Sequence, residues 1–491
     1  MMKLKATVLL FWLMFSTLNL FSQVQKGNDI DGEAANDYSG QSISMPDANT
    51  VAIGAFKNEG NGIERGHTRI YSWNGTAWVQ KGNDIDGEAD YDDSGEIVNM
   101  PDSNTVAIST EVNDGNGPNS GHVRIFSWDG TAWVQKGLDI DGEAADDYSG
   151  SAISMSDANT IAIGAILNDG IVSNAGHVRV FTWDGNAWVQ KGSDIDGSAA
   201  NDLFGGSVSM SDSNTFAVGA IMHTQNAIYD GLVRIFNWNG TAWIQKGADI
   251  YGEEIGDYCG QSVSMPDSNT VAIGAIGNNG NGTDAGRVRI FNWDGSAWVQ
   301  KGNSIDGEAA IDKSGAWVSM PNSNMIAIGA SFNNGNGAVS GHVRIFNWDG
   351  TSWVQIGSDI DGEAAGDHSG AVSMPDTNTL AIGAFGNDGS AINAGHVRVF
   401  TLSSNVEVIE NSFGDGMVVF PNPFEEQLNI NLGSVFTDVA VIVKNAIGQE
   451  TLRKTYSSAN KLNLDIKGEV GMYFVEVISD HNITMLKVIK K

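Results

Sequence analysis

One pattern of apolar and polar positions recurs along most of the chain at a spacing of 55 residues. Each copy opens with Gln-Lys-Gly, or with Gln-Ile-Gly in the last copy, and no gap interrupts the register up to that point. The seven copies begin at Gln25, Gln80, Gln135, Gln190, Gln245, Gln300 and Gln355. A repeat of this length is typical of architectures in which every unit has the same local fold.

Each copy predicts four short strands, and none shows the periodicity of a helix. In the third copy the strands are residues 149–155, 160–165, 176–183 and 187–190, with β-branched residues concentrated in the second. The last two strands are joined by Asp184-Gly185, and other copies have Asp-Gly or Asn-Gly there. This is the strongest short hairpin signal, because both residues tolerate a positive φ.

A tryptophan stands on each side of that turn, as in Trp73 with Trp78. Such a pair could stack across a sugar, but two residues that face each other on adjacent strands also pack directly. We expect cross-strand packing.

Seven four-stranded units predict an all-β fold, a seven-bladed β-propeller over residues 23–402. The seventh copy ends with its third strand at Val397-Arg398-Val399-Phe400 and lacks the Trp-Val-Gln strand. The missing strand is available at the other end of the chain, in residues 23–27, which contain Val24. We expect these residues to complete the seventh blade and close the ring, because closure removes an unpaired sheet edge.

The repeats resemble FG-GAP repeats, the units of the integrin alpha-chain propeller. Gly-Ala follows the second strand in six copies, for example at Gly54-Ala55, and Phe204-Gly205 stands upstream in the fourth. The second copy departs from the pattern, with Ser109-Thr110 in place of Gly-Ala. The resemblance implies a surface-exposed binding propeller. The family's calcium sites are not carried over, because the turn at residues 46–49 is too short to wrap a cation with six to eight oxygens.

The two ends of the chain predict export. Lys3 and Lys5 precede an apolar run over residues 6–21, so residues 1–22 have the form of a removable signal peptide, with a retained anchor as the alternative.

After a linker at 403–414, residues 415–491 predict a small Ig-like β-sandwich. Its Phe420-Pro421-Asn422-Pro423-Phe424 and Gly471-Met472-Tyr473-Phe474-Val475 resemble motifs of the C-terminal sorting domain of the type IX secretion system of Bacteroidetes. The resemblance implies secretion or surface attachment, and contact with that secretion machinery; a generic adhesive sandwich is the alternative.

Composition narrows the class of function. The chain has 491 residues, a net charge of −32 and a single cysteine, Cys259. Non-specific nucleic-acid binding needs clustered Lys and Arg, so we expect no nucleic-acid partner. One cysteine cannot form an intrachain disulfide, and no second apolar run predicts a membrane span after signal removal.

The connectors between copies are acidic and carry two aspartates at alternate positions, which invites a calcium interpretation. The candidate metal ligands are Asp29, Asp31, Asp84, Asp86, Asp139, Asp141, Asp194, Asp196, Asp359 and Asp361. A further aspartate, Asp37 in the first copy, recurs in all seven and is better explained by turn formation. We expect no required cofactor, with Ca²⁺ as the open alternative. The third strand has a His-x-Arg pattern, as in His67 and Arg69, and we expect these residues to pack between blades.

The least regular stretch is the long loop of the fourth copy, residues 221–230. Because long loops on a rigid scaffold commonly carry function, His223, Gln225, Tyr229 and Asp230 are the candidate binding residues. The near-identical copies contain no nucleophile elbow, zinc-ligand spacing or phosphate loop, so we expect no enzyme. The sequence predicts an exported, non-catalytic propeller for adhesion or binding of an extracellular protein or glycan. A hydrolase or lyase acting on polysaccharide, and a structural matrix component, are the alternatives.

Overall fold

The computed structural model describes residues 20–60, 62–225, 227–405, 413, 417–445, 450–479 and 482–491, and the predicted signal peptide and linker fall mostly outside these residues. The chain forms two compact units, one spanning Ser22–Ser403 and the other containing the C-terminal residues to Lys491. The described residues are built from strands and contain no helix, and so none that could cross a membrane.

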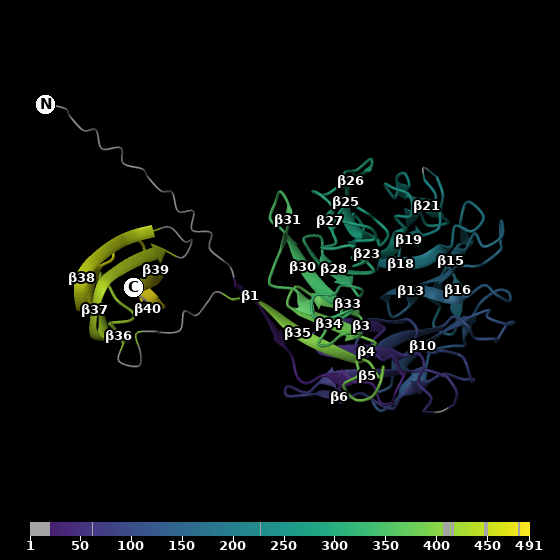
Figure 1. The fold of residues 1–491 in the computed structure, drawn as a ribbon, viewed down its shortest axis with the longest axis horizontal. Coiled ribbons are helices and arrows are strands. Elements are labelled where there is room, and N and C mark those ends of the chain that lie inside the picture. The colour runs from purple at the N-terminus through teal and green to yellow at the C-terminus, as the bar shows by residue number, and fades with distance from the viewer. Residues whose placement is uncertain are drawn as a thin grey trace. The chain divides into compact units, whose positions relative to one another are not determined.

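The first unit is a ring of seven sheets, and corresponding strands repeat in each (Figure 1). The first strands, which line the centre of the ring, are β3 (Ser42–Asp47), β8 (Val98–Asp102), β13 (Ser149–Asp157), β18 (Phe204–Asp212), β23 (Cys259–Asp267), β28 (Trp317–Asn322) and β33 (Ser369–Asp376). The second strands are β4 (Thr50–Ala55), β9 (Thr105–Thr110), β14 (Thr160–Ala165), β19 (Thr215–Ala220), β24 (Thr270–Ala275), β29 (Met325–Ala330) and β34 (Thr379–Ala384). The seven-bladed all-β fold predicted from the sequence is confirmed.

The outer strands continue the same meander. The third strands are β5 (His67–Trp73), β10 (His122–Trp128), β15 (His177–Trp183), β20 (Leu232–Trp238), β25 (Arg287–Trp293), β30 (His342–Trp348) and β35 (His396–Asn405). The fourth strands are β6 (Trp78–Gln80), β11 (Trp133–Gln135), β16 (Trp188–Gln190), β21 (Trp243–Gln245), β26 (Trp298–Gln300), β31 (Trp353–Gln355) and, from the start of the chain, β1 (Leu20–Gln25).

Each sheet also has a fifth strand of two residues that the sequence did not predict. These strands are β2 (Ile30–Asp31), β7 (Ile85–Asp86), β12 (Ile140–Asp141), β17 (Ile195–Asp196), β22 (Ile250–Tyr251), β27 (Ile305–Asp306) and β32 (Ile360–Asp361). The chain leaves the sheet edge after the fourth strand, at a glycine such as Gly82 with φ +84°, and returns to pair with the start of the third strand. The return buries the isoleucine, with Ile85 only 6% exposed, so the first half of each connector belongs to the blade.

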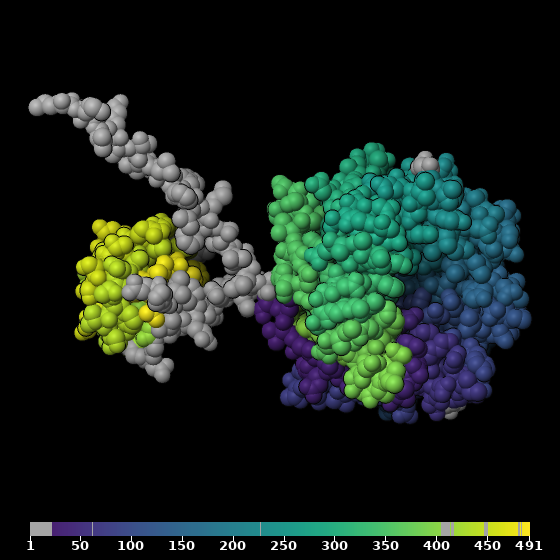
Figure 2. Space-filling view, in the orientation of Figure 1, coloured from purple at the N-terminus to yellow at the C-terminus, as the bar shows by residue number. Residues whose placement is uncertain are grey.

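The ring is closed by its two ends. β1 pairs with β35, and the Lys26 N–H donates to the Val399 carbonyl at 2.6 Å. In Figure 2 the purple atoms of the first described residues lie against the yellow-green atoms of the last blade. A second set of links joins the first strands, where the N–H of Met45 donates to Ser373 Oγ at 2.9 Å and Met100 donates to Ser44 Oγ at 2.9 Å. Equivalent bonds join every neighbouring pair of blades, so the closure is complete.

Tight packing between blades explains the recurring Gly-Ala. A Cβ added to Gly54 would lie 1.9 Å from the Gly95 carbonyl oxygen of the next blade, so no larger residue fits without moving the backbone. Gly54 lies in the second strand β4, which is buried along its whole length. The motif therefore marks the closest approach of neighbouring blades.

Lysines and tryptophans join the blades on the side of the short turns. The two tryptophans of a blade lie opposite each other across the hairpin, as predicted, with ring centroids 5.3–5.5 Å apart. The lysine of the preceding blade lies over both rings; Lys136 Nζ is 5.3 Å from the Trp183 ring and 5.2 Å from the Trp188 ring. Trp188 Nε1 donates to the Lys136 carbonyl at 2.7 Å. We call this arrangement of one lysine and two tryptophans a seam clamp.

The C-terminal unit is one five-stranded sheet of β36 (Val418–Phe420), β37 (Gln427–Asn445), β38 (Glu450–Asp465), β39 (Gly471–Ser479) and β40 (Asn482–Lys490). A register shift between Asn431 and Phe436 divides β37, so that its first half pairs with β36 and its second with β39. Side chains from both halves, including Leu428 and Val441, share one core. The small sandwich expected here is realised as a single sheet that curves around that core.

Candidate functional site

The aspartate that recurs in every connector forms a buried turn. Asp37 Oδ2 accepts hydrogen bonds from the N–H groups of Glu33 at 3.0 Å and Ala34 at 2.8 Å, and the side chain is 1% exposed. Each counterpart accepts the bond equivalent to that of Ala34 and is also buried. In the next loop an asparagine reaches back to this carboxylate, as Asn113 Nδ2 does to Asp92 Oδ1 at 3.1 Å. These aspartates hold connector and loop together, which is the turn-forming role that their recurrence indicated.

The ten aspartates predicted as metal ligands separate into two sets. In the first set, Asp29, Asp84, Asp139, Asp194 and Asp359, one oxygen accepts a hydrogen bond from the glutamine four residues earlier, at 2.5 Å from Gln25 Nε2 to Asp29 Oδ1. In the second set, Asp31, Asp86, Asp141, Asp196 and Asp361, each residue lies opposite a third-strand residue in the sheet, as Asp86 lies opposite His67. The structure thus does not gather each Asp-x-Asp pair around one point, and the calcium role stays a prediction.

A histidine and a glutamate join the first set of aspartates. Five groups of one His, one Glu and one Asp have ligand atoms within 4.8 Å of one another. They are His67 with Glu33 and Asp84, His122 with Glu88 and Asp139, His177 with Glu143 and Asp194, His342 with Glu308 and Asp359, and His396 with Glu363 and Asp29. We call them the seam triads. Sequence reasoning missed the glutamates and read the histidines as packing. The sequence does contain a signal that could have identified the triads. Five copies have the histidine, the glutamate and the aspartate together, whereas each of the other two copies has only one of the three residues.

Burial makes the triad histidines neutral at physiological pH. Burial has the largest effect on the imidazole pKa values, and a nearby arginine adds to it. Together, burial and Arg124 lower the pKa of His122 to about 4, and burial and Arg179 lower the pKa of His177 to about 4. The same causes lower the pKa of His67, His342 and His396. The imidazoles therefore do not form ion pairs with the carboxylates beside them.

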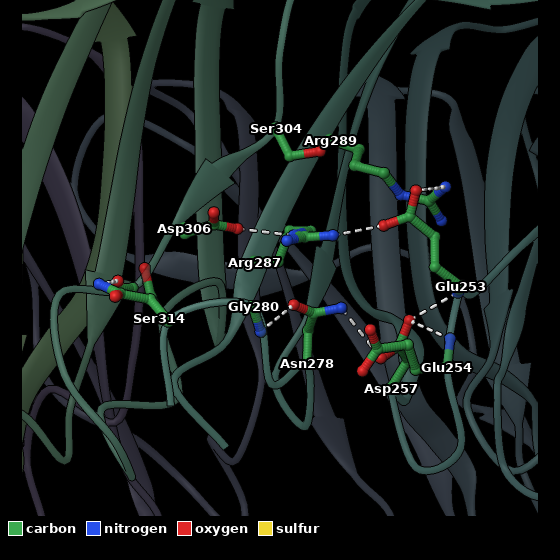
Figure 3. A network of polar contacts seen from close by, with 12 residues as sticks. Glu253, Glu254, Asp257, Asn278, Gly280, Arg287, Arg289, Ser304, Asp306 and Ser314 are labelled. Carbon is green, nitrogen blue, oxygen red and sulfur yellow. Dashed lines mark hydrogen bonds and ion pairs between the residues drawn. The ribbon is translucent and has the colours of Figure 1, made fainter. Parts of the chain in front are cut away.

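The blade that has arginine in place of this histidine shows what that position faces. Arg287 lies between two carboxylates, with Nε 2.6 Å from Asp306 Oδ1 and Nη1 2.5 Å from Glu253 Oε2 (Figure 3). Ser304 stands in that blade where the other copies have the triad aspartate. The pocket at this point of the seam accommodates a positive charge.

The four predicted binding residues of the fourth loop do not share one environment. His223 is buried and its Nδ1 lies 2.9 Å from Asp202 Oδ1, so it takes the place of the asparagine of other copies. Asp230 is also buried and accepts the Gln225 N–H at 3.2 Å. Gln225 and Tyr229 are exposed, and the Tyr229 ring stacks on Tyr258 at 6.3 Å. A binding role for this loop stays a prediction, and only its exposed pair is available to a large ligand.

The centre of the ring is hollow and is lined by both polar and apolar side chains. A cavity of about 410 Å³ is lined by the first strands of all seven blades, at the end where the connectors and long loops emerge. Small residues such as Ser42 and Ser262 and the amides of Gln41 and Gln261 line it together with valine and isoleucine side chains. Trp317 is the only aromatic side chain among the described lining residues, and it stands where other copies have small residues or Ile97. We call this cavity the central channel.

The second blade brings two carboxyl groups together beside the central channel. Glu96 and Glu111 are hydrogen-bonded to each other, and burial followed by the neighbouring negative charge raises their pKa values to about 8 and about 7. One proton is therefore shared by the pair at neutral pH. Sequence reasoning passed over both residues, although no other copy has an acid at either position.

Comparison with known proteins identifies the C-terminal unit. Residues 418–491 match the family described as "Secretion system C-terminal sorting domain", so the sorting domain predicted from the sequence is confirmed and the chain is exported, to the cell surface or the medium. No curated protein matches the sequence.

Several solved structures share features of the ring. A putative 6-phosphogluconolactonase from Bacteroides uniformis is 10% identical, with 66% of this chain and 85% of that chain covered and a TM-score of 0.47. The β-propeller domain of the Trilobed protease from Pyrococcus furiosus is 11% identical, with 70% and 87% covered and a TM-score of 0.40. PorZ, a surface component of the type-IX secretion system of Porphyromonas gingivalis, is 12% identical, with 90% and 73% covered and a TM-score of 0.23. Since these TM-scores are low, the fold rests on the strand pairing within this chain.

Proposed function

We propose that the protein is an exported, non-catalytic binding propeller with FG-GAP-like repeats, and that its ligand is an extracellular glycan held at the mouth of the central channel. The observation that carries this proposal is the lining of the channel, in which one aromatic ring, two glutamine amides and four serine hydroxyls stand among valine and isoleucine side chains. An aromatic face packs on the apolar side of a sugar, while amides and hydroxyls exchange hydrogen bonds with its hydroxyl groups.

The mouth of the central channel also lies on the side of the ring that carries its longest loops. The long loops and connectors emerge there, and such loops on a rigid ring are free to extend a binding surface. The exposed pair Gln225 and Tyr229 lies in one of these loops, so the proposal includes them as peripheral contacts. Adhesion to a glycan-coated surface would follow from such binding.

The alternative of a polysaccharide hydrolase is favoured by one observation, the Glu96–Glu111 pair. Retaining and inverting glycosidases hold their two carboxyl groups roughly 5–9.5 Å apart, so that a sugar or a water can lie between them. Two carboxyl groups in a direct hydrogen bond are closer than that. The pair is therefore unsuited to this chemistry, and we propose that the ring binds without turnover.

The test is a glycan array followed by calorimetry on the purified chain with the best glycan. Trp317→Ala should weaken binding by about tenfold, since one ring stacked on a ligand contributes about 1.4 kcal/mol at the upper end for aromatic contacts. Val134→Ser, on a half-exposed residue of β11 away from the channel, is the matched control. Failure of every extracellular glycan to bind, or equal affinity in Trp317→Ala, would contradict the proposal. Turnover that Glu96→Gln abolishes would establish the hydrolase instead.

A further inference from the structure

The five seam triads have the geometry of metal-ion ligands rather than of hydrogen-bonded pairs. The Nδ1 atoms of His67, His342 and His396 lie 3.6–3.7 Å from the nearest aspartate oxygen, and Nδ1 of His177 lies 3.9 Å from its glutamate. These separations exceed a hydrogen bond. They are close to the separation of about 3.4 Å expected between two ligands that each bind one tetrahedral zinc ion at about 2.1 Å.

The triad histidines are buried and unsatisfied. Their side chains are only 1–2% exposed, and each Nε2 has no hydrogen-bond partner within the described part of the chain. The other ring nitrogen, Nδ1, points at the two carboxylates. Nδ1 lies 3.6–3.9 Å from the carboxylate oxygens that it faces, which is too far for a hydrogen bond, so this nitrogen is the one available to a ligand shared with the carboxylates.

Neighbouring side chains orient one oxygen of each carboxylate and leave the other facing the histidine. In the first blade Gln80 Nε2 donates to Asp84 Oδ1 at 2.6 Å, while Asp84 Oδ2 faces His67. Arg69 Nη1 lies 3.3 Å from Glu33 Oε1. In the sixth blade the same arrangement leaves Glu308 Oε2 and Asp359 Oδ2 both facing His342 Nδ1. Such outer contacts are those that fix metal ligands in place.

The two blades without a triad histidine provide an internal comparison. In the fifth blade Arg287 supplies a cation of its own to Glu253, and the triad aspartate is Ser304. In the fourth blade Leu232 replaces the histidine and Ser198 replaces the glutamate. The remaining acid there, Asp249, is paired by Arg234 at 2.9 Å. In both blades two of the three triad residues are absent, and an arginine pairs with the one carboxylate that remains.

We propose that each seam triad binds one divalent transition-metal ion of the zinc class, through His Nδ1, Glu Oε2 and Asp Oδ2. One imidazole nitrogen and two carboxylate oxygens form a mixed donor set that suits Zn²⁺ and similar ions, whereas Ca²⁺ requires six to eight oxygens. Water would complete the coordination on the exposed side of the carboxylates. The ion would join the connector entering a blade, which carries the glutamate, to the third strand and the connector leaving it.

The experiment uses the tag-free full chain after removal of metal by a chelator and dialysis. Titration calorimetry and elemental analysis should show about five equivalents of Zn²⁺ and no comparable uptake of Ca²⁺. Zn²⁺ should also raise the Tm, because an ion that binds only the folded state stabilises it. Co²⁺ in place of Zn²⁺ should give visible absorption bands that report direct coordination.

Two variants copy natural blades, so both should fold. His122→Leu reproduces the fourth blade and Asp139→Ser reproduces the fifth, and each should lower the bound Zn²⁺ by one equivalent. His223→Asn removes a histidine outside the triads and is the matched control. Uptake of less than one equivalent of Zn²⁺, an unchanged stoichiometry in His122→Leu, or equal uptake of Ca²⁺ would each overturn the proposal.

Discussion

In six of the seven seams a lysine from one blade lies over the two tryptophans of the next, whereas the seam between the sixth and seventh blades has Ile356, Leu402 and Gln23 at the equivalent positions. Gln23 stands at this seam because the fourth strand of the last blade is contributed by β1, from the start of the chain. Gln23 contacts this seam by donating from Nε2 to the Ser358 carbonyl at 2.9 Å. The chain crosses all seven seams, including this one, and the ring is closed inside the seventh blade by the backbone pairing of β1 with β35.

The largest effect should come from removing residues 23–27. Without them β35 loses its fourth-strand partner and keeps β34 on its other side, so an unpaired edge is exposed, and the Lys26 clamp on Trp73 and Trp78 is lost. Several backbone hydrogen bonds of about 1 kcal/mol each go with the strand, so the Tm should fall by more than ~10 °C. Circular dichroism and size-exclusion chromatography would measure the loss. An unchanged Tm and hydrodynamic radius would show that the ring does not depend on this closure.

A clamp removed from a regular seam should cost less. Trp188→Leu and Lys136→Met should each lower the free energy of unfolding by about 1–2 kcal/mol, because the ring pair and the cation–π contact are partly exposed. A double-mutant cycle by urea denaturation should give a coupling of about 0.5–1 kcal/mol between the two residues. Purely additive effects would mean that the lysine and the tryptophan act independently.

The second blade departs from the repeat in another way, and its Glu96–Glu111 pair should make stability depend on pH. Both folded-state pKa values, about 8 and about 7, lie above the ordinary value of 4.5. The folded protein therefore retains protons that the unfolded chain releases, so stability should be full below pH ~4.5 and should fall as pH rises through about 8. Glu96→Gln with Glu111→Gln should raise the Tm by a few °C at pH 8.5 and flatten its pH profile. Glu254→Gln, an exposed acid of another blade, should leave the slope as it is.

The smallest effect should come from building a clamp into the seam between the sixth and seventh blades. Ile356→Lys with Leu402→Trp and Gln23→Trp should add about 0.5–1 kcal/mol, if the seventh blade accommodates the rings as the others do. Leu402→Trp alone should give no gain, because the buried leucine site has no lysine beside it. Thermal denaturation of the triple variant against the wild type would measure the gain, and a lower Tm would mean that the seam between the sixth and seventh blades packs differently from the other six.

Much of the ring could be predicted from the sequence. Seven blades and their closure were indicated by the 55-residue period, the Asp-Gly hairpins and the unmatched strand at residues 23–27. Each of these features can be recognised from a few neighbouring residues or by counting repeats. The two-residue strand of each connector was missed, since Ile85-Asp86 is too short to show a period and its pairing with His67 and Thr68 depends on a partner far along the chain. The alternation of Asp84 and Asp86 suggested one shared site, but the return of the chain to the sheet edge directs them to different neighbours.

The sequence alone therefore determined the repeat, the strands, the closing segment and the sorting domain, since these depend on turn chemistry and apolar spacing within a few residues. Only the tertiary structure decided which acids meet which histidines and that Glu96 meets Glu111. Those encounters join residues from separate strands or connectors, and their distances are set by how the blades pack against one another.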